Sequence, residues 1–225
     1  TKNYAEALTA ERLFSWHGAL FPSGRSGLAQ IRVAAWRDDV GGPMQVLSGP
    51  IGREKVNYTA PPAEDLGVEI KRFLAWFEQP SDVDMVLKDG LAHLWLVTLH
   101  PFDDGNGRIA RAVGDLLLAR SEQSHQRFYS LSAQIQQERA DYYTVLEQTQ
   151  KGGLDVTEWL LWFLNCLQRA ISRAEDTLSA VLVRALLLEM FANTSMNQRQ
   201  IKVLNRMLDG FDGKLTTSKW ANLTK

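Results

Sequence analysis

Residues 100–111 have the sequence His-Pro-Phe-Asp-Asp-Gly-Asn-Gly-Arg-Ile-Ala-Arg, and this stretch decides how the chain of 225 residues is interpreted. An apolar segment precedes it, and Pro101 disfavours a helical backbone at the residue before it. His100 is therefore predicted to leave the end of a buried helix and to enter a loop. There the surroundings of an imidazole can tune its protonation near neutral pH.

The second half of the stretch has the composition of an anion-binding loop. Gly105-Asn106-Gly107 provide flexible backbone whose N–H groups can curl around an anion. A helix is predicted to start here, and its N-terminus adds unpaired N–H donors and a partial positive charge. Arg108 and Arg111 lie three positions apart on that helix, so both guanidinium groups can reach one phosphate cluster.

Two carboxylates come directly before the glycines. Mg²⁺ usually takes one or two carboxylates besides phosphate oxygens, so Asp103 or Asp104 could hold such a cation. The stretch is thus suited to a nucleotide polyphosphate and Mg²⁺ beside a positioned imidazole. It is not a Walker motif, because no Gly-Lys-Ser/Thr follows, and no strand is predicted before it, as a Rossmann fingerprint requires.

Outward from this stretch, the apolar pattern is helical. Residues 66–77 carry an apolar stripe, and Pro61-Pro62 and Pro80 limit that helix. The next helix is predicted to run from a cap at Ser81 or Asp82 through Leu99, and it is expected to be central because it is apolar almost all round. Further helices are predicted at residues 109–120, 133–150, 156–174, 177–191 and 197–208. The fold class is therefore mainly α.

Residues 21–62 depart from the helical pattern because they are rich in glycine and proline. Short extended segments at residues 44–47 and 55–58 flank a turn at 49–54. This arrangement is typical of a loop that carries a small β-hairpin.

Composition excludes several classes of protein. The formal charge is −1, so the chain is not a bulk polyanion binder, although a local basic patch remains open. Hydrophobic residues make up 45% of the chain, too many for intrinsic disorder. The single cysteine, Cys166, rules out a disulfide framework and a cysteine-based zinc site, and is expected to be a buried apolar residue. No apolar stretch approaches the roughly 20 residues of a membrane span, so we expect a cytoplasmic protein without membrane contact.

Residues 100–111 resemble the motif of the Fic (Fido-domain) family, His-Pro-Phe-x-Asp/Glu-Gly-Asn-Gly/Lys-Arg, at every required position. The resemblance implies a Fic-fold helical bundle with a small β-hairpin flap. It implies a catalytic domain at residues 1–192, with the flap at about 44–58. It also implies transfer of AMP from ATP to a Ser, Thr or Tyr hydroxyl of a target protein.

The resemblance assigns roles to the residues of the motif. His100 would be the general base that deprotonates the acceptor hydroxyl, and Asp104 would ligate the Mg²⁺ that bridges the α- and β-phosphates. Arg108 would hold the β-phosphate and Arg111 the γ-phosphate end. Phe102 would anchor the loop in the core.

Further roles follow from the same resemblance. Gly105, Asn106 and Gly107 would form the anion hole. The flap would align the target segment by strand addition, with Val56, Asn57 and Tyr58 in its second strand. Tyr143 or Tyr142 would line the adenine site, with Gln150 near the edge of the base, although tyrosines at such positions more often serve helix packing.

One family element has no counterpart in the chain. Many members carry an inhibitory helix with the pattern Ser/Thr-x-x-x-Glu-Gly/Asn, whose glutamate pairs with the second arginine of the motif. No glutamate of this sequence has Ser or Thr four places before it. The resemblance leaves open that this element lies upstream of Thr1, in which case the same glutamate could support removal of AMP from the target.

The last residues, 193–225, are interpreted as a linker and the start of a second module. Residues 197–209 indicate a helix, and residues 213–221 indicate the capped start of another. This order is similar to the opening of a winged helix-turn-helix, which some Fic proteins append. DNA contact would then depend on a recognition helix beyond Lys225.

Two other functions remain open at this point. The same loop could transfer another group, such as UMP, because the phosphate-binding residues would be identical. Alternatively, the protein could be a regulator that senses a nucleotide and binds DNA. The target protein, self-modification and a homodimer are also left open. His93 is expected to be a core residue, and His17 and His125 receive no role.

Overall fold

The structure is a computed structural model that describes residues 2–50, 52–191, 196–208, 210–211 and 213–224. These residues form two compact units, one within residues 1–171 and the other within 172–225. The division falls inside the long helix α7 (Thr157–Phe191). The boundary expected at 192/193 lies outside the described residues, so it remains a prediction.

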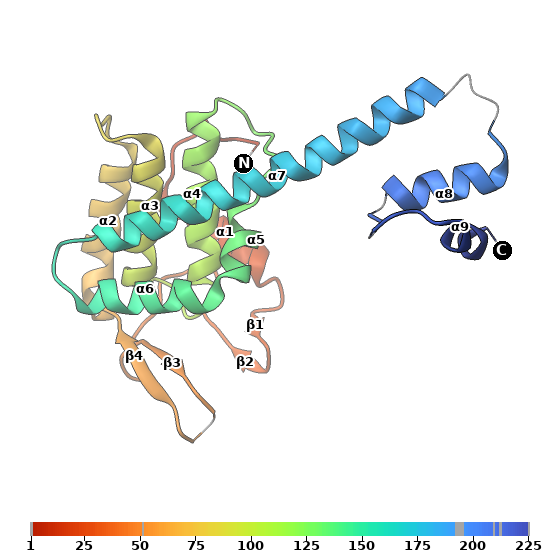
Figure 1. The fold of residues 1–225 in the computed structure, drawn as a ribbon. Coiled ribbons are helices and arrows are strands. Elements are labelled where there is room, and N and C mark those ends of the chain that lie inside the picture. Colours follow the sequence, from red (N-terminus) through yellow and green to blue (C-terminus); the bar gives the residue numbers. More distant parts are fainter. Residues whose placement is uncertain (1, 51, 192–195, 209, 212, 225) are drawn as a thin grey trace. The chain divides into compact units, whose positions relative to one another are not determined.

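The first unit is helical apart from two small hairpins, as the apolar pattern predicted (Figure 1). Its elements before α7 are α1 (Ala10–Leu20), β1 (Arg25–Ser26), β2 (Ala29–Gln30), β3 (Gln45–Ser48), β4 (Lys55–Thr59), α2 (Ala63–Glu78), α3 (Met85–Leu99), α4 (Asn106–Ser121), α5 (Leu131–Gln137) and α6 (Arg139–Lys151).

Helix α3 is the centre of this unit, as expected from its apolar surface. It packs against α4 along much of its length and against α2 on another side. The start of α7 crosses α3 at Gly90, where a Cβ atom would lie 2.9 Å from the Leu160 side chain. At this crossing the indole of the buried Trp159 donates to the Gly90 carbonyl at 2.8 Å. The core thus surrounds the helix that ends at the 100–111 motif.

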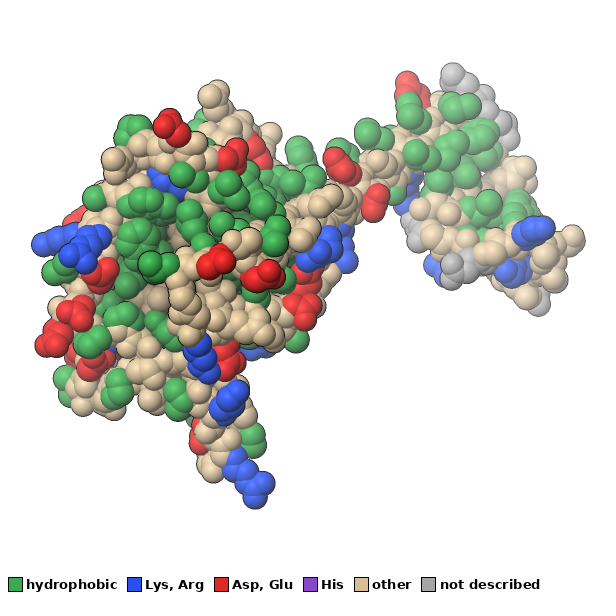
Figure 2. Space-filling model, turned by 60° about the vertical axis from the view of Figure 1, so that its left-hand side comes forward, with side chains coloured by type: hydrophobic (Ala, Val, Ile, Leu, Met, Phe, Trp, Pro, Cys, Tyr) green, Lys and Arg blue, Asp and Glu red, His purple; other side chains and the backbone are tan. Residues whose placement is uncertain are grey.

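The predicted hairpin is formed by β3 and β4, which pair antiparallel with Gln45 opposite Thr59. A bulge between Val46 and Leu47 interrupts the register. The hairpin projects from the helical body and carries basic side chains (Figure 2). The β1–β2 hairpin was not predicted, because strands of two residues leave no alternating pattern in a sequence.

Several predicted boundaries were wrong. The helix expected at 133–150 is two helices, because the backbone at Glu138 leaves the helical region and Arg169 of α7 binds its carboxylate at 2.5 Å. The helices expected at 156–174 and 177–191 are one, α7, in which the Thr177 hydroxyl donates to the Arg173 carbonyl at 2.9 Å. The cap of α3 is Asp84, which accepts from the Val86 amide, and not Ser81 or Asp82. Helix α1 was missed altogether.

The second unit contains the end of α7, α8 (Gln198–Leu208) and α9 (Thr217–Leu223). Val203 of α8 is buried. The predicted capped helix start is confirmed, because the Thr216 hydroxyl accepts from the Lys219 amide at 3.3 Å. Among the described residues, no helix combines the length and apolar character that a membrane span needs.

The core of the first unit yields a stability prediction. Phe73→Ala should lower the free energy of unfolding by about 3–5 kcal/mol, because it removes a ring with no exposed surface and leaves a cavity. Val68→Ala on the same helix, where Val68 is 55% exposed, should change it by about 0.5 kcal/mol or less. Urea denaturation followed by circular dichroism measures both. Equal losses would contradict this account of the core.

Candidate active site

His100 follows the last residue of α3 in a left-handed conformation, with φ 46° and ψ 59°. The helix ends where Pro101 predicted, but the backbone of His100 is left-handed rather than extended. The ring atom Nδ1 lies 2.5 Å from the Val97 carbonyl. Because a carbonyl only accepts, Nδ1 carries the proton, and Nε2 keeps its lone pair in the neutral ring. Burial lowers the pKa of His100 from its usual value, so the ring is neutral at pH 7.

Phe102 and Asn106 close the loop that follows. The Phe102 ring has no exposed surface and stacks on His17, with ring centroids 4.2 Å apart and planes 9° apart. The Asn106 side chain accepts from the Phe102 amide at 2.9 Å and donates to its carbonyl at 2.8 Å. The carboxamide of Asn106 is therefore held within the loop by one accepted and one donated bond.

His17 holds the loop from α1. Its Nδ1 accepts from the Ala34 amide at 3.2 Å, so Nε2 carries the proton and donates to the Asp104 carbonyl at 3.0 Å. Burial lowers the pKa of His17, which keeps this tautomer neutral. Sequence reasoning assigned His17 no role, because its partner lies 87 positions away along the chain.

Gly105 directly precedes α4 in a left-handed conformation with φ 82°, and a Cβ there would lie 2.8 Å from the Phe21 ring. Only glycine satisfies both conditions. The amides of Asn106, Gly107 and Arg108 follow in the first turn of α4, where no intrahelical acceptor exists. In this structure the Gly105 amide itself donates to the Asp104 carboxylate at 2.5 Å.

The two arginines of the motif border the same cavity, which has a volume of about 370 Å³. The Arg108 guanidinium lies 4.5 Å from the Phe21 ring centroid and 3.9 Å from the Asp104 carboxylate. The Arg111 guanidinium lies 3.4 Å from the place where a Gly107 side chain would begin. The positive end of α4 and both guanidinium groups therefore meet on one wall.

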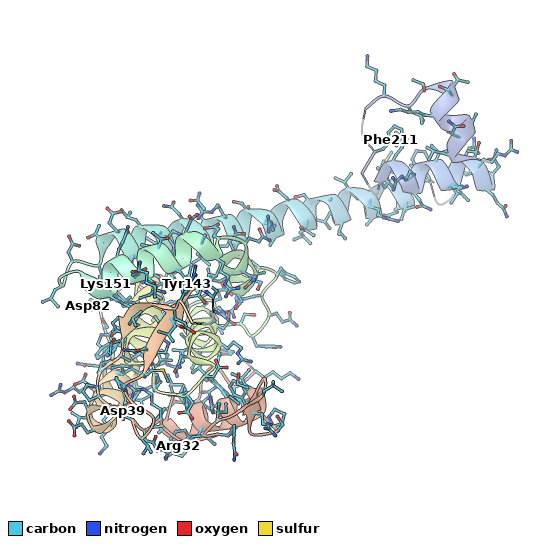
Figure 3. All side chains as sticks on the ribbon, turned by 90° about the horizontal axis from the view of Figure 1, so that it is seen from below. Arg32, Asp39, Asp82, Tyr143, Lys151 and Phe211 are labelled. Carbon is cyan, nitrogen blue, oxygen red and sulfur yellow. The ribbon has the colours of Figure 1, made fainter. Side chains whose placement is uncertain are left out.

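The opposite walls come from the hairpin and from α6. Asn57 and Tyr58 of β4 line the cavity, as do Tyr143 and Gln150 of α6. Figure 3 labels Tyr143 where α6 passes close to the hairpin. Val56 does not line the cavity; it pairs with Leu47 and is 44% exposed.

Thr98 of α3 holds the side chains of Tyr58 and Gln150 through hydrogen bonds. The Tyr58 hydroxyl donates to the Thr98 carbonyl at 3.1 Å, and the Gln150 amide donates to the Thr98 hydroxyl at 3.2 Å. Tyr142 also borders the cavity but is buried, and its hydroxyl lies 3.1 Å from Nε2 of the core residue His93. Tyr143 is the more accessible of the two tyrosines.

Asp104 is the carboxylate directly before the glycines of the motif. Its side chain is 46% exposed at the cavity, beside the N-terminus of α4. The Ser26 hydroxyl donates to the same carboxylate. Asp103 also borders the cavity, where it accepts from the Arg32 amide at 2.8 Å. Within the described part of the chain, His, Cys, Asp and Glu form no cluster of three, so Mg²⁺ would need ligand oxygens from a bound phosphate.

Similar proteins carry the same fold. The structure of a Fic family protein from Desulfovibrio desulfuricans superposes with a TM-score of 0.58 at 20% identity, over 96% of this chain and 56% of the other. Fic-1 from C. elegans superposes with a TM-score of 0.57 at 21% identity, over 78% of this chain and 45% of the other. At these identities the likeness concerns the fold.

Curated relatives match a smaller part. Protein adenylyltransferase Fic of Nematostella vectensis is 31% identical over 117 residues, which are 51% of this chain and 26% of the relative. The protein of the same name from Drosophila mojavensis is 31% identical over 109 residues, which are 48% of this chain and 20% of the relative. The chain thus spans about a quarter or less of these relatives.

The profile of the Fic/DOC family matches residues 7–118, from the segment before α1 to the last turn of α4. This range includes the hairpin and the whole 100–111 motif. Together with the mainly helical fold, the match shows that the chain belongs, through this domain, to the Fic/DOC family.

Proposed function

We propose that this domain is a protein adenylyltransferase that transfers AMP from ATP to a Ser, Thr or Tyr hydroxyl of a target protein. One observation carries the proposal. The neutral imidazole of His100 borders the same cavity as the N-terminus of α4 and the guanidinium groups of Arg108 and Arg111. The names of the curated relatives support the same reaction.

In the proposed step the acceptor oxygen bonds to the α-phosphorus, and the bond from that phosphorus to the oxygen bridging to the β-phosphate breaks. The acceptor proton passes to Nε2 of His100, and pyrophosphate leaves. Catalysis then consists of positioning and of stabilising negative charge. The backbone amides of Gly105, Asn106 and Gly107 would face the phosphates, after the Gly105 amide exchanges its bond to Asp104.

The arginines have separate roles in this proposal. Arg108, which is held over the Phe21 ring, would bind the β-phosphate, and Arg111 would bind the γ-phosphate end. Asp104 would hold Mg²⁺ beside the bound phosphates. The ion, when bound, would neutralise the charge that develops on the leaving pyrophosphate.

The adenine would lie against α6 and the acceptor along the hairpin. Tyr143 would stack on the base and Gln150 would contact its edge. The β3–β4 hairpin would add the target segment as a further strand, with Val56, Asn57 and Tyr58 in the strand that leads to the site. Val56 would contact the target rather than the nucleotide, because it lies outside the cavity lining.

Alternatives share the same phosphate-binding wall. Transfer of UMP differs only in the base contacts of Tyr143 and Gln150. A nucleotide-sensing regulator that binds DNA is favoured only by the second unit, where α8 and α9 follow one another as in the opening of a winged helix-turn-helix. The proposal also includes self-modification, a homodimer and a cytoplasmic location. It includes removal of AMP from the target, if an inhibitory glutamate outside this sequence supports that reaction.

His100→Ala should abolish labelling of protein by isotopically labelled ATP with Mg²⁺, because no other group would accept the hydroxyl proton. His125→Ala is the matched control, since His125 is exposed outside the cavity lining. Autoradiography of the protein and of a lysate measures both. Undiminished labelling by folded His100→Ala would remove this residue from the mechanism.

The rate of transfer at saturating substrates should stay level as the pH falls towards 6.5 and should decline only below that value. Burial lowers the pKa of His100 from 6.5, so the neutral base is present above the lowered pKa and is lost below it. A series of buffers at constant ionic strength measures the profile. A rise in rate centred above pH 7 would be incompatible with this state of the base.

Donor preference separates the alternatives. Labelling from ATP should exceed labelling from UTP and CTP at equal concentration, and Gln150→Ala should reduce this preference more than it reduces labelling overall. Gln148→Ala on the same helix serves as the control, because Gln148 does not line the cavity. Preferred labelling from UTP would favour UMP transfer instead.

A further inference from the structure

Arg37 is a buried charge between the hairpin and the motif. Its side chain has no exposed surface. Nε donates to the His100 carbonyl at 2.7 Å, and Nη2 donates to the Pro61 carbonyl at 2.5 Å and to the Leu99 carbonyl at 3.5 Å. Nη1 bonds the Asp39 carboxylate at 2.6 Å. One guanidinium thus joins the end of α3 to the segment that follows the hairpin.

The backbone around Arg37 extends this connection. Its amide donates to the Pro101 carbonyl at 2.9 Å, so the carbonyls of His100 and Pro101 are both held by this one residue. A left-handed residue such as His100 depends on such restraints, because the conformation is strained for a residue other than glycine.

Asp39 completes the connection on the other side. Its second carboxylate oxygen accepts from the Ala63 amide at 2.7 Å, at the first residue of α2. Helix α2 has no side-chain cap of its own at Pro62, so Asp39 supplies the missing acceptor. Figure 3 labels Asp39 at a distance from Tyr143, so this connection lies apart from the α6 wall of the cavity.

The hairpin base is tied to the same group. Strand β4 ends at Thr59, and the Ala60 amide donates to the Met44 carbonyl at 2.9 Å just before Pro61. The direction in which β3 and β4 leave the body is therefore set next to the carbonyl that Arg37 holds. The hairpin and His100 share one buried restraint.

We propose that Arg37 is the positioning residue of this site. Its guanidinium fixes the hairpin base relative to the left-handed turn of His100, so that an acceptor hydroxyl on the hairpin lies next to Nε2 of His100. The proposal rests on the proposed transfer reaction for its kinetic consequence. Its structural content, the restraint of the His100 turn, stands independently of that reaction.

The nucleotide wall provides the contrast. Arg37 bonds neither Arg108, nor Arg111, nor the first turn of α4, all of which the structure describes, so nucleotide binding should not depend on it. Misplacing a base and an acceptor by about 1 Å can cost roughly 100-fold in rate. Loss of the Arg37 guanidinium should therefore lower kcat for AMP transfer and leave the affinity for ATP unchanged.

The test compares Arg37→Lys and Arg37→Gln with the control Arg32→Gln, whose side chain is 47% exposed and pairs with Asp38. We expect kcat for transfer to fall roughly 100-fold in both Arg37 variants, with ATP affinity by calorimetry unchanged. Arg32→Gln should match the unmodified protein. If a folded Arg37→Lys variant had the same kcat as the unmodified protein, the proposal would be overturned. A loss of ATP binding as large as the loss of kcat would also overturn it.

A second measurement needs no catalysis. The ¹⁵N spectrum of the imidazole of His100 in the nucleotide-free protein should show the Nδ1-protonated form, and Arg37→Gln should produce a mixture of both tautomers. If the unmodified protein transfers nothing, the proposed function fails while this spectrum still decides the role of Arg37. An unchanged spectrum would overturn that role. If either Arg37 variant does not fold, Asp39→Asn removes the charge of the partner and should give the same kinetic and spectroscopic result.

Discussion

The connection between α3 and α4 must reverse the chain within residues 100–105, because the two helices pack side by side. Both ends of this connection are left-handed, at His100 and at Gly105. The glycine adopts this conformation without cost, whereas the histidine does not. The turn therefore persists because its surroundings hold it: Asn106 closes on Phe102, His17 stacks on Phe102, and Arg37 binds the His100 carbonyl.

The same reversal produces the chemistry of the site. A helix that ends in an imidazole is followed within one tight loop by a helix that begins with unpaired amides. The left-handed turn leaves Nε2 of His100 with its lone pair beside the donors and guanidinium groups of α4. Burial then keeps the imidazole neutral by lowering its pKa. A neutral imidazole and a wall of N–H and guanidinium donors thus come from one structural constraint.

Much of this could be predicted from sequence because it is local. The helical period, the prolines that limit α2, the hairpin and the glycine-rich start of α4 all depend on residues a few positions apart. The errors have different physical origins. At Glu138 a tertiary contact overrode local preference, because Arg169 binds Glu138 from another helix and the chain bends there. Asp176-Thr177 has the composition of a break and yet stays within α7, where the Thr177 hydroxyl donates to the Arg173 carbonyl of the same helix.

By itself, the sequence determined the order of chemical groups at the site: an imidazole, an acid, two glycines around an asparagine, and two arginines one helical turn apart. These groups are close in space because they are close in the chain. The contact between Nδ1 of His100 and the Val97 carbonyl, which sets the tautomer, is also local, because the two residues are three positions apart. Only the tertiary structure decided what holds the loop and its left-handed turn. His17 lies 87 positions from Asp104, Arg37 lies 63 positions from His100, and Asp39 lies 24 positions from Ala63. Such restraints arise when a packed core brings distant polar groups together, and a local pattern contains no trace of that.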